Sequence, residues 1–105
     1  MFFKHTNLAD APFMAAAVVS ACRINAWTNE LQPQFLSVIF KQLMQYDCDF
    51  QTLPVISIDE FARRMPEQEK RNEVIDLMLA VEMLCAEIPK ETSDAVSLWA
   101  NKLGI

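Results

Sequence analysis

The chain has 105 residues, of which 52% are hydrophobic and 22% charged, and its formal net charge is −5. This length and apolar content are enough for one hydrophobic core, so they exclude intrinsic disorder of the whole chain and leave no room for a second domain. The basic residues form no extended cluster, which argues against nucleic acid as a partner because phosphate contacts dominate that affinity.

The composition favours helices over strands. One Gly is too few for the tight turns of a β-rich chain, and five widely spaced Pro suit the breaks between helices. We therefore predict a single all-α domain over residues 1–105, with about five helices arranged as two helical-hairpin halves around a central apolar helix at residues 67–86. No apolar run approaches the roughly 20 residues that a membrane-spanning helix needs.

The N-terminal third begins with a lead-in, residues 1–8, whose Phe2 and Phe3 are expected to fold back onto the core. Pro12 fits the first turn of a helix, so the first helix is predicted to start near residues 9–11 and to end near Trp27.

The residues before Cys22 also resemble the box that precedes a lipid-modified cysteine in bacterial signal peptides. Asp10 abuts the apolar run, and the basic region contains only Lys4 with the ionisable His5. A buried helix is therefore the better interpretation of this stretch.

The second, third and fourth helices are predicted between residues 33 and 86. Pro33 opens a helix whose apolar residues recur at helical spacing through Tyr46, and Ser57 to Glu60 match a capping box that starts a short third helix. Residues 47–65 are expected to form a variable cap on the fold. The fourth helix contains the run RNEVIDLMLAVEMLCA, which is apolar almost all the way round and must be enclosed by other helices.

The fifth helix is predicted to start after Pro89 and to be capped by Gly104, the one glycine. The basic side chains of the third and fourth helices are predicted to be solvated, although they could also dock an acidic partner; they are Arg63, Arg64, Lys70 and Arg71.

An internal repeat appears when residues 17–31 are aligned with residues 74–88. Each segment is an apolar helix that ends in a small turn, a Glu and an aliphatic residue, followed by a proline-bearing helix start. Such a pattern suggests a duplicated helical hairpin, although two unrelated amphipathic hairpins could also produce it.

The two turns, WTNELQPQ at residues 27–34 and LCAEIPKE at residues 84–91, resemble those of TerB-like domains from the tellurite-resistance family. The C-terminal sequence WANKLGI is similar to the Ala-x-x-Leu-Gly-Ile end of that family. The resemblance covers about residues 11–46 and 72–105. It implies a helical, non-enzymatic module associated with stress or tellurite resistance, which acts through protein–protein interaction.

The resemblance also implies a divalent-metal site, because the family's turns carry aspartate and glutamate, whose oxygens suit hard cations. Thr28 and Cys85 replace the two aspartates in this chain. The remaining candidate ligands are Glu30, Glu87 and Glu91. Such a reduced set would hold Ca²⁺ or Mg²⁺ weakly at best, and each glutamate near a helix start also has a plain role as a partner of the helix dipole.

Catalytic chemistry has little support in the sequence. His5 is the only histidine, and no Ser or Cys is spaced as its partner. Cys48 is expected to be the exposed thiol and a poor nucleophile, because Asp47 and Asp49 should raise its pKa. Cys22 and Cys85 fit buried, reduced thiols of a cytoplasmic protein. We therefore predict that the chain is not an enzyme and has no certain cofactor.

Binding to a protein partner, or self-association, is the expected activity. Trp27 and Trp99, near helix ends, are the candidate contact residues. Core packing is the default for both, but either one, if partly exposed beside methionines, would make a patch for a partner. The alternative to a TerB-like module is a homodimerising or partner-binding helical adaptor unrelated to that family, with a Met- and Phe-rich working surface.

Overall fold

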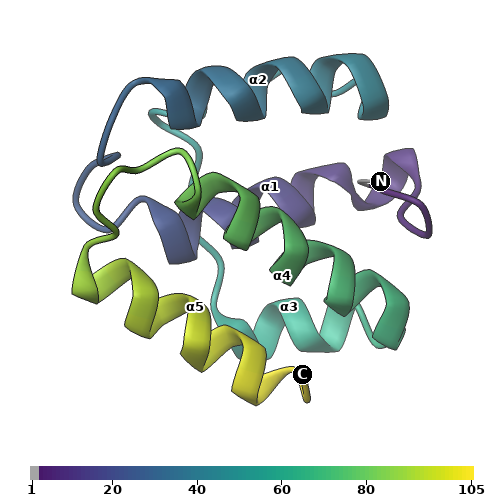
Figure 1. The fold of residues 1–105 in the computed structure, drawn as a ribbon. Coiled ribbons are helices and arrows are strands. Elements are labelled where there is room, and N and C mark those ends of the chain that lie inside the picture. The colour runs from purple at the N-terminus through teal and green to yellow at the C-terminus, as the bar shows by residue number, and fades with distance from the viewer. Residues whose placement is uncertain (1–2) are drawn as a thin grey trace.

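A computed structural model describes residues 3–105, and every regular element in that range is a helix (Figure 1). The predicted all-α class with five α-helices is therefore confirmed. The elements are a short 3-10 helix η1 (Leu8–Asp10), α1 (Ala11–Cys22), α2 (Leu31–Met44), α3 (Ile58–Arg64), α4 (Gln68–Glu82) and α5 (Lys90–Lys102).

Side-chain caps set the starts of η1 and α3, and a proline marks the start of α1. Asn7 and Asp10 form a reciprocal capping box around η1, and Pro12 occupies the first turn of α1. The Oγ of Ser57 accepts from the amide of Glu60 at 3.1 Å, as predicted for α3. The Glu60 carboxylate does not complete that capping box; it lies near the guanidinium groups of the two arginines one turn later.

Helix ends agree less well with the sequence. The helix α1 stops at Cys22 rather than near Trp27, since Arg23 leaves the helical conformation and Asn25 adopts a left-handed φ of 69°. The helix α4 stops at Glu82, four residues before its predicted end. Gly104 has a φ of 82°, which only glycine adopts freely, so its predicted role as C-terminal cap is confirmed.

The helices α1 and α4 together form the centre of the fold. The helix α4 contacts α1, α2 and α5, as predicted. The helix α1 contacts all four other α-helices and holds most of the fully buried small and aliphatic side chains, so it shares the central position. The expected enclosure of α4 by other helices is incomplete, because Leu79 in α4 and Met83 directly after it are exposed, Met83 by 81%.

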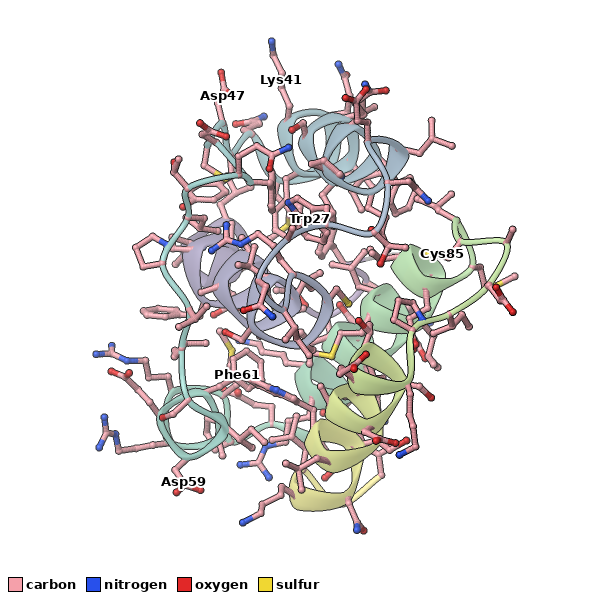
Figure 2. All side chains as sticks on the ribbon, turned by 90° about the vertical axis from the view of Figure 1, so that its left-hand side faces the viewer. Trp27, Lys41, Asp47, Asp59, Phe61 and Cys85 are labelled. Atoms are coloured by element: carbon pink, nitrogen blue, oxygen red, sulfur yellow. The ribbon has the colours of Figure 1, made fainter. Side chains whose placement is uncertain are left out.

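The segment 47–65 is part of the core rather than a variable cap. Phe50, Phe61 and Met65 are all buried, and the Phe50 ring lies 5.4 Å from that of Phe40 in α2. Figure 2 shows Phe61 directed into the molecule from α3 while Asp59 points away from it. Apolar residues without a helical period therefore anchor this connection.

Two of the four basic residues expected to be solvated have structural roles. Arg71 donates from Nε to the carbonyl of Met65 at 2.7 Å and from its guanidinium to that of Ala62 at 2.8 Å. The Nζ of Lys70 lies 2.8 Å from the carboxylate of Asp10, and that contact raises the pKa of Lys70. Both side chains tie α4 to neighbouring elements.

The lead-in segment packs on the core at Phe3, whose ring lies 5.0 Å from that of Phe40. Phe2, the other aromatic residue predicted to fold back, lies outside the described residues. Among residues 3–105, no helix combines the length and apolar character needed to cross a membrane.

Candidate functional site

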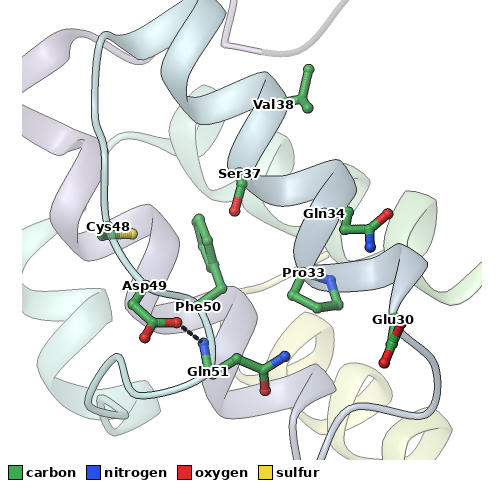
Figure 3. A pocket seen from close by; sticks show the side chains of 9 residues that line it. All are labelled: Glu30, Pro33, Gln34, Ser37, Val38, Cys48, Asp49, Phe50 and Gln51. Carbon is green, nitrogen blue, oxygen red and sulfur yellow. Dashed lines mark hydrogen bonds between the residues drawn. The ribbon is translucent and has the colours of Figure 1, made fainter.

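A groove lies between α2 and the loop 48–51 (Figure 3). Its volume is about 560 Å³, within the range of small-ligand pockets. One wall is the N-terminal half of α2, and the other is the loop that follows Tyr46. The groove is lined by Glu30, Pro33, Gln34, Ser37, Val38, Cys48, Asp49, Phe50 and Gln51.

The floor of the groove is apolar and fixed. Phe50 is only 2% exposed and its ring packs on Phe40. Its carbonyl accepts hydrogen bonds from Arg23 at 2.8 Å and from the indole of Trp27 at 3.1 Å. Arg23 also donates to the carbonyl of Leu53 at 2.7 Å. Two side chains that follow the C-terminal end of α1, those of Arg23 and Trp27, therefore hold the loop in place.

The loop wall is closed by a tight turn at Asp49. Its Oδ1 accepts from the amide of Gln51 at 2.9 Å, the bond drawn in Figure 3. Its carbonyl accepts from the amides of Thr52 and Leu53 at 3.2 and 3.0 Å. The backbone is thus satisfied within the turn, and the position of the Asp49 side chain is set.

Two carboxylates, those of Glu30 and Asp49, lie on opposite walls of the groove (Figure 3). Neither belongs to an ion pair found among residues 3–105, and the same holds for exposed Asp47 beside the loop. The groove therefore combines an apolar floor with two exposed carboxylates that belong to none of the ion pairs found in residues 3–105.

Cys48 lines the groove and is half-buried rather than fully exposed. Burial is the largest cause of its raised pKa; a hydrogen bond with Tyr46 lowers the pKa, and the charges of Asp47 and Asp49 raise it. The predicted rise in the pKa of Cys48 is correct, but its main cause is burial rather than the neighbouring aspartates. The side chain is therefore a neutral thiol at neutral pH and a weak nucleophile.

The three predicted metal ligands are all exposed. Glu30 directly precedes α2, Glu87 lies in the connection between α4 and α5, and Glu91 lies in the first turn of α5. Within residues 3–105, no three His, Cys, Asp or Glu side chains are grouped so that they could hold a metal ion.

The two turns that carry the family resemblance do meet, through neutral amides. Asn29 donates from Nδ2 to the carbonyl of Leu84 at 3.0 Å. Gln32, which is fully buried, donates to the carbonyl of Val81 at 3.3 Å and to the sulfur of Cys85 at 3.2 Å. Its Oε1 accepts from the amide of Thr28 at 2.9 Å. An amide network therefore joins the two halves where the resemblance implied carboxylates.

Comparisons with protein-family models, curated proteins and solved structures find no match. What the groove can bind is therefore inferred from its own residues and geometry.

The two tryptophans predicted to contact a partner are engaged inside the molecule. Trp99 is 4% exposed and its ring lies 5.6 Å from that of Phe61, so core packing removes it from the surface. Trp27 is half-buried and donates to the carbonyl of Phe50. Trp27 thus holds the loop wall of the groove through its hydrogen bond to Phe50 and does not line the groove itself.

Glu82, at the end of α4, is a buried titratable group that the sequence analysis did not single out. It is 5% exposed, and burial raises its pKa. Its charge is also the second cause, after burial, of a Cys22 pKa of about 12. The ionised carboxylate therefore opposes folding at neutral pH.

Glu82→Gln is expected to become more stabilising as the pH rises from about 4 to about 7. A folded-state pKa above the unfolded value contributes stability below the unfolded pKa, and that contribution is lost as the pH rises through the folded pKa. Urea unfolding of both proteins across this range measures the difference. A constant difference would show that Glu82 is solvated in the folded state.

Proposed function

We propose that this chain is a non-enzymatic, TerB-like helical module that binds a segment of another protein in the groove between α2 and the loop 48–51. The observation that carries the proposal is the groove itself, with its apolar floor at Phe50 and Pro33 and its polar rim. Apolar pockets with a few placed polar groups are the usual form of a binding site.

The fixed position of the loop wall supports binding. Arg23 and Trp27 hold the carbonyl of Phe50, and Asp49 closes the turn beside it. A preformed site avoids the free-energy cost of ordering a loop when the partner binds.

A non-enzymatic role agrees with the side chains present. The thiol of Cys48 has a raised pKa, and His5 lies in the N-terminal segment that bonds to α4 rather than in the groove lining. The free cysteines, of which Cys22 is buried, support a cytoplasmic, reducing location. The proposed relation to TerB-like stress-associated domains rests on the sequence resemblance at residues 27–34 and 84–91.

Filling the groove tests the proposal. Peptides selected from a random 12-residue display library against the wild-type chain are expected to lose at least about tenfold in affinity on Ser37→Phe, because the new ring occupies the space above the floor. Titration followed by fluorescence anisotropy measures the affinity.

The matched control is Ser97→Phe, the same change at an exposed position of α5. It is expected to leave the affinity unchanged. The proposal fails if no peptide is selected, or if both variants bind the selected peptides as the wild type does.

A further inference from the structure

The charge of the groove identifies the chemistry of its partner. Glu30 and Asp49 both line the groove, and the ion pairs found among residues 3–105 use the carboxylates of other residues. Among the side-chain hydrogen bonds found in residues 3–105, Asp49 accepts at Oδ1 from the amide of Gln51. Two opposed carboxylates beside an apolar floor favour a cationic group flanked by an apolar one.

The size of the groove limits the partner to a short segment. A volume of about 560 Å³ holds a few side chains rather than a whole helix. The amides of Gln34 and Gln51 and the hydroxyl of Ser37 lie along its edges in Figure 3, where they can bond to a partner's backbone.

We infer that the groove recognises a short segment of another protein in which Lys or Arg lies next to an aliphatic or aromatic residue. The apolar side chain packs on exposed Val38, above the buried Phe50 and Pro33, and the cation pairs with a carboxylate of the groove lining, Glu30 or Asp49. This inference rests on the proposed function and adds the chemistry of the partner.

Two features of the charge distribution sharpen the inference. Exposed Lys41 lies one helical turn after Ser37 in α2, near the end of the groove that Val38 lines. Its positive charge repels a partner's cation from that end and favours the end that Glu30 and Asp49 line. A second copy of this chain is disfavoured as the occupant, because each copy carries a net charge of −5.

The test measures two things: which charged residues are enriched in peptides selected on the wild-type chain, and how their affinity changes when the two carboxylates of the groove are neutralised. Peptides selected on the wild-type chain are expected to be enriched in Lys or Arg beside apolar residues. The double variant Glu30→Gln with Asp49→Asn keeps the shapes of both side chains and removes their charges. Each amide retains one acceptor oxygen and replaces the other with an NH2 donor. The double variant is expected to bind the selected peptides roughly fivefold more weakly, with less dependence on salt.

The matched control, Asp59→Asn with Glu91→Gln, removes the same charge from exposed positions on α3 and α5 and is expected to change affinity by less than about twofold. Selected peptides that are acidic or neutral would overturn the inference while leaving groove binding intact. Equal losses in the two double variants would also overturn it, since they would reflect net charge alone. Selection of no peptide would defeat the proposed function as well.

Discussion

Glu73→Ala is expected to lower the free energy of unfolding by about 2–4 kcal/mol. The Glu73 carboxylate is buried in α4 and accepts from the amide of His5 at 2.6 Å, the amide of Thr6 at 3.2 Å and the hydroxyl of Thr6 at 2.6 Å. Removing the acceptor leaves the buried Thr6 groups without a partner. Urea denaturation followed by circular dichroism measures the loss.

The matched control is Asp76→Ala, which removes an exposed carboxylate from the same helix and is expected to change stability by less than about 0.5 kcal/mol. Thr6→Val removes one of the three bonds and is expected to cost about 1 kcal/mol. Amide hydrogen exchange should also accelerate at residues 5 and 6 in the Glu73 variant. A loss no larger than that of Asp76→Ala would mean that the N-terminal segment is not held by this carboxylate.

Sequence reasoning succeeded where the determining interaction is local. The hydrogen bond from the Glu60 amide to Ser57 spans three residues, and the positive φ at Gly104 concerns that residue alone, so both could be predicted. The contact between Glu73 and Thr6 joins residues 67 positions apart. Nothing in the pattern around Glu73 distinguishes it from a solvated helix carboxylate.

The candidate site was predicted only in part for the same reason. Glu30 was singled out as a metal ligand, and the structure places it in the groove lining; the part of the chain that the structure describes has no group of three metal-ligating side chains. Gln32 was missed, although a polar residue directly before Pro33 in an apolar helix is a signal that could have been followed. Its role depends on Val81 and Cys85, which come from the other half of the chain.

Arg23→Ala is expected to destabilise the fold by about 2–3 kcal/mol and to weaken peptide binding in the groove. The guanidinium donates to the carbonyls of Phe50 and Leu53, so a single side chain fixes two points of the loop that forms one groove wall. Its loss also leaves Trp27 as the sole side-chain donor to the carbonyl of Phe50 among the hydrogen bonds found in residues 3–105. Urea unfolding and the peptide titration measure the two effects.

Comparison with Arg23→Lys separates geometry from charge. An ammonium group cannot reproduce the planar two-point contact of a guanidinium, so the lysine variant is expected to recover no more than about half of the lost stability. Arg63→Ala, at an exposed position of α3, is the control for losing a positive charge and is expected to change stability by less than about 0.5 kcal/mol. Faster amide exchange at residues 51–53 in Arg23→Ala would locate the change in the groove wall. Full peptide affinity in a destabilised Arg23→Ala protein would show that the groove does not depend on this anchor, and the wall would then be held by Phe50 packing on Phe40.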